Sequence, residues 1–216
     1  MRKLIYMGLE SYSSRYTYQL TEWTRRVLDR REIDYVIVPG QTLDDSEAIV
    51  VGQVLDAHGR SYFGMSQMMN LVKMMREGSV TGEDVIFFED MFTPGIESLA
   101  YIMDQVEPQW RPKVFVRCLA QTIDPDDFTN STGMTRWMRP YEHMVNGFVT
   151  ALLMSNEEMV MHAKVAGWNV PMYNISGLSF GLSEVLSRVP SVTPYDQRAH
   201  RISFASRWDT EKQPHY

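Results

Sequence analysis

Short apolar runs alternate along the chain with longer stretches in which apolar residues recur every three or four positions. The short runs predict buried strands, and the longer stretches predict amphipathic helices. Strands that alternate with helices are typical of βαβ units, in which successive strands are parallel. We therefore expect an α/β fold with a doubly wound, largely parallel, Rossmann-like sheet.

Seven segments carry strand signals, namely 4–7, 35–38, 85–88, 114–116, 151–154, 170–175 and 202–205. Helical stripes begin at Tyr16 and Met65. A third helix is expected to start at Thr93 as the N-cap and Pro94 as the first helical residue. A fourth is expected to start at Ser155–Glu158, which fits a capping box, and to end at Gly167. Residues 41–60 are ambiguous, because Ile49–Val51 fits either a short strand or part of a helix.

This pattern divides the chain into three parts. Residues 1–182 are expected to form one Rossmann-like acceptor domain. Residues 183–200, which contain two prolines, are expected to be a linker. The strand at 202–205 then opens a second domain, and with the chain ending at Tyr216 we interpret residues 201–216 as the start of a truncated donor domain.

The composition of the chain indicates its cellular compartment and limits the partners it can bind. A single cysteine, Cys118, excludes an internal disulfide and favours a reducing compartment, where a buried structural thiol is the default. The apolar start is too short for a signal peptide, and no apolar run approaches the length of a membrane span, so we expect a cytoplasmic protein. With a net charge of -6, binding to a polyanion requires a local basic patch. Two sets of residues could supply one: Arg25, Arg26, Arg30 and Arg31, or Arg111, Lys113, Arg117, Arg136 and Arg139.

Ligands of parallel sheets bind beyond the carboxyl ends of the strands, so residues that follow strands are the site candidates. After the first strand, Gly8 with Ser13, Ser14 and Arg15 forms a candidate ligand loop, although an ordinary turn explains it equally well. Glu89 and Asp90 follow the strand at 85–88, where a carboxylate can accept a proton from a substrate hydroxyl. The alternative is that Asp90 stabilises the N-terminal turn of the next helix.

Two further clusters concern charge. Arg207 and Lys212 follow the last strand and could hold a diphosphate from two sides, and the alternative is a solvated surface cluster. Asp124–Asp127 could hold a divalent metal, but Asp124 as N-cap and Pro125 as first helical residue favour a helix start. The five histidines lack ligand spacing, so we assign no metal.

Residues 201–212 resemble the opening of the donor domain in GT-B glycosyltransferases of group 1 (GT4-like), where a strand is followed by Gly/Ser-Arg and, a few residues later, Glu-Lys. The resemblance implies transfer of a sugar from a nucleotide-diphosphate sugar to an acceptor hydroxyl. Arg207 and Lys212 would bind the donor diphosphate in place of a metal, and no further cofactor would be needed. In that reaction Asp90, or else Glu89, would be the general base.

The chain also resembles, less closely, phage enzymes that glycosylate hydroxymethylated pyrimidines in DNA, which implies DNA as a candidate acceptor. We expect this length of chain to be inactive alone, and to act as a homodimer or with a complementing C-terminal half. The alternative class is a non-catalytic α/β binding module that docks onto a partner subunit carrying the active site.

Overall fold

The computed structural model describes residues 2–12, 16–43, 56–125, 127–175, 187, 191 and 193–199. In these residues the sheet has six strands, all parallel, in the order β2-β1-β3-β4-β5-β6. The expected doubly wound α/β fold is confirmed. The strand bounds are β1 (Leu4–Met7), β2 (Tyr35–Ile37), β3 (Val85–Phe88), β4 (Lys113–Cys118), β5 (Ala151–Met154) and β6 (Met172–Asn174).

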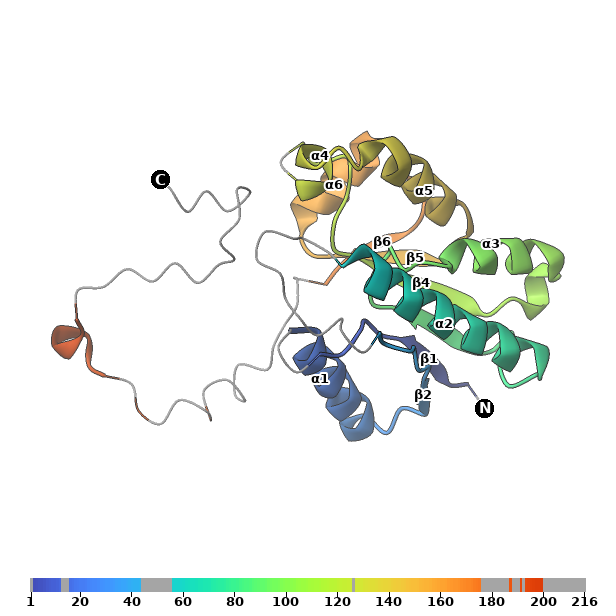
Figure 1. The fold of residues 1–216 in the computed structure, drawn as a ribbon, viewed down its shortest axis with the longest axis horizontal. Helices are drawn as coiled ribbons and strands as arrows, with labels where there is room; N and C mark the ends of the chain where they lie inside the picture. The colour runs from blue at the N-terminus through green and yellow to red at the C-terminus, as the bar shows by residue number, and fades with distance from the viewer. Residues whose placement is uncertain are drawn as a thin grey trace.

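The helices lie on both faces of this sheet (Figure 1). The chain passes from β1 to β2 in one direction and from β2 to β3 and onward in the other. Right-handed crossovers therefore place α1 on one face and α2, α3, α5 and α6 on the opposite face. The helix bounds are α1 (Tyr16–Arg30), α2 (Ala57–Arg76), α3 (Ile96–Gln105), α4 (Phe128–Ser131), α5 (Thr135–Phe148) and α6 (Glu157–Val165), with 3₁₀ turns η1 (Pro108–Trp110) and η2 (Tyr195–Gln197). None of the helices in the described part of the chain combines the length and apolarity needed to cross a bilayer.

The core lies between the central strands and the helices of the more heavily covered face. Alternate strand residues point the same way, and Ile86 and Phe88 of β3 are fully buried beside Val116 of β4 and Leu152 of β5. Helix α3 adds Leu99, which is also fully buried. Strands covered in this way carry nearly continuous apolar runs, which is why their sequences predict them well.

Three expected helix starts are wrong in detail. Thr93 does not cap α3; Gly95 occupies the N-cap with a φ of 95°, and the Thr93 hydroxyl donates to the carbonyl of Asp90 (2.7 Å). Asp127, not Asp124, caps α4, because its carboxylate accepts from the amide of Thr129 (2.9 Å). At α6 the cap is Asn156, one residue after Ser155. At α4 and α6 a later side chain accepts a free amide of the first turn, whereas the N-cap of α3 is a glycine that makes no side-chain cap.

Other boundaries also differ from expectation. Helix α5 has no counterpart in the expected elements, and α2 begins at Ala57, where Asp56 accepts from the amides of His58 and Gly59. The end of α6 is as expected, with Gly167 at a φ of 84°. The segments at 49–51 and 202–205 lie outside the described residues, and the expected domain boundaries stay predictions.

Helix α2 closely approaches the turn between β3 and α3. A Cβ on Gly64 would lie 2.8 Å from Cδ of Pro94, and one on Gly95 would lie 2.8 Å from Cγ of Met68. Both contacts are shorter than side chains tolerate. Glycine at these two positions therefore lets α2 lie directly against the turn.

Replacing Gly95 by alanine should destabilise the protein by about 2 kcal/mol or more, because the new methyl group meets Met68 and the residue keeps a left-handed backbone. The matched control is Gly147→Ala in α5, where nothing lies within 4 Å of the added Cβ. That control should be neutral or stabilising by up to about 1 kcal/mol. Urea unfolding measures both; equal effects of the two substitutions would contradict the close approach.

Candidate functional site

The carboxyl ends of β1 and β3 form the switch point of the sheet. Strand β1 pairs with β2 on one side and with β3 on the other, so the segments that leave β1 and β3 diverge. In open α/β sheets this divergence creates the crevice in which ligands bind. Met7 is opposite Phe88 in the β1–β3 register. The structure thus brings Gly8 next to Glu89 and Asp90, as their positions after two strands predict.

Glu89 joins the ends of three strands and has no exposed surface. Its carboxylate accepts a hydrogen bond from the hydroxyl of Tyr6 in β1 (2.8 Å) and forms an ion pair with Arg117 of β4. Its amide donates to the carbonyl of Met7 (3.0 Å). Burial raises the pKa of Glu89, and burial together with the adjacent carboxylate raises the pKa of the Tyr6 phenol. Glu89 therefore lies behind the crevice, where it positions the strand ends.

Asp90 lies nearer the surface and pairs with a cation from α2. The guanidinium of Arg60 contacts the Asp90 carboxylate, reaches Glu10 at 3.4 Å, and donates to the carbonyl of Phe92 at 3.3 Å. The other carboxylate oxygen of Asp90 accepts from the amide of Phe92 (3.1 Å). Arg60 thus lies between two carboxylates that follow β1 and β3. Each Asp90 oxygen retains a lone pair for a further donor.

The expected alternatives for Asp90 are therefore not exclusive. Through the amide of Phe92 and the hydroxyl of Thr93, Asp90 shapes the turn that leads to α3. The Asp90 side chain is also 14% exposed, whereas the Glu89 side chain has no exposed surface. Of the two carboxylates, Asp90 is the one that a substrate can reach without rearrangement of the sheet.

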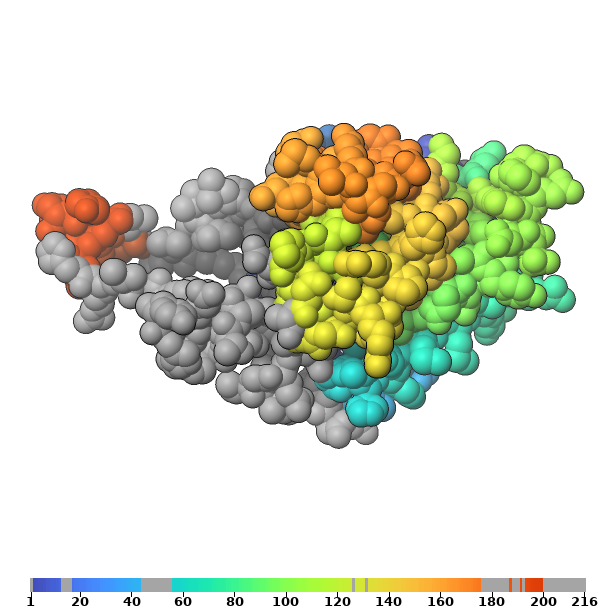
Figure 2. Space-filling view, turned by 90° about the horizontal axis from the view of Figure 1, so that it is seen from above, coloured from blue at the N-terminus to red at the C-terminus, as the bar shows by residue number. Residues whose placement is uncertain are grey.

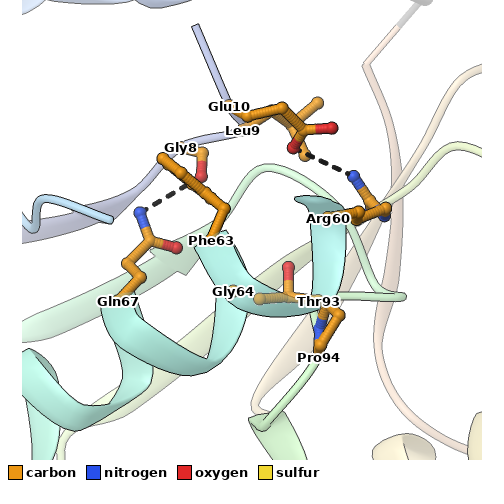
Figure 3. A pocket seen from close by; sticks show the side chains of 9 residues that line it. All are labelled: Gly8, Leu9, Glu10, Arg60, Phe63, Gly64, Gln67, Thr93 and Pro94. Carbon is orange, nitrogen blue, oxygen red and sulfur yellow. Dashed lines mark hydrogen bonds and ion pairs between the residues drawn. The ribbon is translucent and has the colours of Figure 1, made fainter. Parts of the chain in front are cut away.

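Helix α2 closes the inner side of the crevice (Figure 3). Gln67 donates to the carbonyls of Gly8 (3.2 Å) and Val38 (2.9 Å), and Phe63 and Gly64 face the same loop. The cavity left beside Arg60 has a volume of about 10 Å³, which suits one water molecule. Small-molecule sites occupy roughly 300 to 1,000 Å³. A substrate would therefore bind at the outer rim of this edge, where Asp90 is partly exposed.

The remaining site candidates are placed as follows. Ser13, Ser14, Arg15, Arg207 and Lys212 lie outside the described residues. The five-residue basic set does not form one surface, because Arg117 is paired with Glu89 and Nε of Arg111 donates to the carbonyl of Val106 (2.7 Å). In the other set, Arg25 pairs with Glu22 on α1. Sequence reasoning missed Arg60 and Tyr6, since neither belongs to a local motif.

No group of three metal-ligating side chains is found among the described residues. Asp126 is not one of the described residues. Cys118 is buried, as expected for a structural thiol, and its Sγ donates to the carbonyl of Ala120 (3.2 Å). Burial raises the pKa of this thiol well above its usual range. A protonated, buried thiol is unsuited to nucleophilic chemistry.

No protein-family model matches the chain, and a search of curated proteins finds no match. The support for a function therefore comes from the site and from the resemblance of residues 201–212 to the start of a GT-B donor domain. Within the described residues, the strongest chemical feature is the group formed by Glu10, Arg60, Glu89, Asp90 and Arg117 at the switch point.

The buried Glu89–Arg117 pair predicts strong energetic coupling. Glu89→Gln and Arg117→Met should each destabilise the protein by about 3 to 5 kcal/mol, because each leaves a buried charge without its partner. The double variant should be much less destabilised than the sum of the two. The control cycle uses Glu22→Gln and Arg25→Gln, an exposed pair whose coupling should be below about 1 kcal/mol. Similar coupling energies in both cycles, measured by urea unfolding, would contradict this role of Glu89.

Proposed function

We propose that the chain is the acceptor-side part of a GT-B glycosyltransferase that moves a sugar from a nucleotide-diphosphate sugar to an acceptor hydroxyl in the cytoplasm. The observation that supports this most is the accessible carboxylate of Asp90, held by Arg60 at the switch point of a doubly wound sheet. This is the edge at which such sheets bind ligands. The resemblance of residues 201–212 to the start of a donor domain supports the same reaction.

In this reaction the acceptor oxygen attacks the anomeric carbon of the donor sugar. The bond between that carbon and the diphosphate oxygen breaks, and the diphosphate leaves with the electron pair. Asp90 accepts the proton of the acceptor hydroxyl, which suits a mechanism with inversion at the anomeric carbon. Arg60 keeps the Asp90 carboxylate in place, and Arg207 and Lys212 offset the charge that develops on the leaving diphosphate.

The acceptor class follows from the weaker resemblance to phage enzymes. Hydroxymethylated pyrimidine in DNA is therefore the first acceptor to test, because it supplies the hydroxyl that the reaction needs. A non-catalytic module that docks onto a partner subunit is the rival class. Stable co-purification with a second polypeptide that carries all the activity would favour this rival.

Asp90→Asn should lower kcat by about 100-fold to 10,000-fold in the protein that carries this chain with a complete donor domain, because the acceptor proton loses its base. The measurement is release of nucleoside diphosphate from a panel of nucleotide sugars in the presence of hydroxymethylated DNA. The control is Asp104→Asn, the same chemical change at an exposed position of α3, which should leave kcat unchanged. If Asp90→Asn retained kcat within about threefold, Asp90 would not be the base.

Arg207→Ala should lower turnover in the same assay by about 100-fold or more, because one of the two cations on the diphosphate is lost. The fold, followed by circular dichroism, should stay intact. Unchanged turnover would remove Arg207 from the donor site.

A further inference from the structure

A second concave surface lies away from the switch point, between α5 and α6. Residues of both helices line it, and in Figure 2 the yellow surface that includes α5 adjoins the orange surface that includes α6. Helix α5 packs against α3 and α4, whereas α6 packs against β5 and β6. An open groove of about 1380 Å³ separates them. It shares no lining residue with the cavity beside Arg60, so it is a separate feature of the molecule.

One wall of this groove is basic. Arg136, Arg139 and His143 follow one another at spacings of three and four residues, so they lie on the same face of α5. Both arginines are exposed, and neither takes part in the ion pairs found among the described residues. In a chain with a net charge of -6, such a wall is a local site for an anion.

Among the described residues that line the groove, Glu142 is the one with a carboxylate, and this carboxylate is already hydrogen-bonded. Glu142 is buried, and its two oxygens accept from the amide and the hydroxyl of Thr122, each at 2.6 Å. It is therefore bound to the turn that follows β4. Burial raises the pKa of Glu142, whereas these hydrogen bonds and the nearby charge of Arg139 lower it, so Arg139 already interacts with one carboxylate. The exposed charge on the α5 wall is positive, and guanidinium groups bind phosphate oxygens particularly well.

The other end of the groove combines an amide with an indole ring. Neither the amide nitrogen nor the amide oxygen of Asn146 has a hydrogen-bond partner, although both atoms are buried. Nδ1 of His162, on the facing helix, is also buried and without a hydrogen-bond partner. The half-buried Trp168 lines the groove as well. Buried polar atoms in proteins are normally paired. These atoms have almost no accessible surface, so the Asn146 side chain has to turn its amide toward the groove before a ligand can offer it a donor and an acceptor. A purine edge offers this combination to an asparagine amide.

We propose that the α5–α6 groove binds an adenine nucleotide, with its phosphates on Arg136 and Arg139 and its base near Asn146 and Trp168. Arg136 and Asn146 are ten residues apart on α5, about 15 Å along the helix axis, which leaves room for base, ribose and phosphates in a row. The groove is larger than a typical small-molecule pocket, so the nucleotide remains partly exposed to solvent. This site is independent of the proposed donor site at Arg207 and Lys212.

The first experiment measures ADP binding by calorimetry in full-length chain that carries Arg207→Gln and Lys212→Gln, so that the proposed donor site does not contribute. ADP should bind, and the added double substitution Arg136→Gln, Arg139→Gln should weaken binding at least tenfold. Both arginines are exposed, so folding should be unaffected, which circular dichroism checks. The control Arg76→Gln, an exposed arginine of α2, should leave ADP affinity unchanged. Absence of ADP binding, or equal affinities with and without Arg136 and Arg139, would overturn the proposal.

A second measurement separates recognition of the base from binding of the phosphates. Pyrophosphate should bind more weakly than ADP, and Asn146→Leu should reduce ADP affinity to that of pyrophosphate while leaving pyrophosphate binding unchanged. Amide chemical shifts should move on α5 and α6 when ADP is added. Equal affinities of ADP and pyrophosphate for the chain with Asn146 intact would refute the base contact, and shifts confined to other elements would refute the site. Because the assay omits the donor site, failure of the glycosyltransferase proposal does not affect its result.

Discussion

The contact between Glu89 and Arg117, with the hydroxyl of Tyr6 on the same carboxylate, is the constraint on which the candidate site depends. Tyr6 lies in β1, Glu89 directly follows β3 and Arg117 lies in β4, three neighbouring strands, and Glu89 has no exposed surface. Taking charges out of water is costly, so the arrangement persists only while all three partners remain together. Any change of register among these strands would leave a buried charge unpaired. Asp90, the next residue, is therefore presented at the rim in a fixed position.

The strands could be predicted from the sequence because each is a compact apolar run. Leu4–Met7, Val85–Phe88 and Ala151–Met154 have the predicted bounds, since all four residues of each strand are apolar and polar residues or turns follow them. Helix starts were less accurate. Several carboxylates near Asp124 can accept a first-turn amide of α4, and α3 begins after a glycine with a left-handed backbone, so only the three-dimensional path of the chain selects the first helical residue.

Half of the candidate site was also predictable. Glu89 and Asp90 follow a strand, and the carboxyl ends of parallel strands meet at one edge, so the topology alone brings them beside Gly8. Arg60 could not be found in this way, because its partner Asp90 lies 30 residues along the chain and no local pattern connects them. The same holds for the groove. Its basic wall belongs to α5, which was not among the expected elements, although apolar residues recur along it at Met138, Tyr141, Val145 and Phe148 on both sides of Pro140.

The wholly parallel sheet also has a consequence for how this protein reaches its native state. Among the described strands none pairs with its neighbour through a tight hairpin, and Leu4 of β1 pairs with Val85 of β3, about 80 residues later in the chain. The chain loses entropy when it closes such long loops, and no contact offsets this loss until the strands have paired, so folding is slow. During synthesis the first apolar strand emerges well before its central partner exists. Newly made chains therefore expose the unpaired edge of an apolar strand for longer than a helical bundle of this size would. Chaperones should affect the yield of this protein strongly.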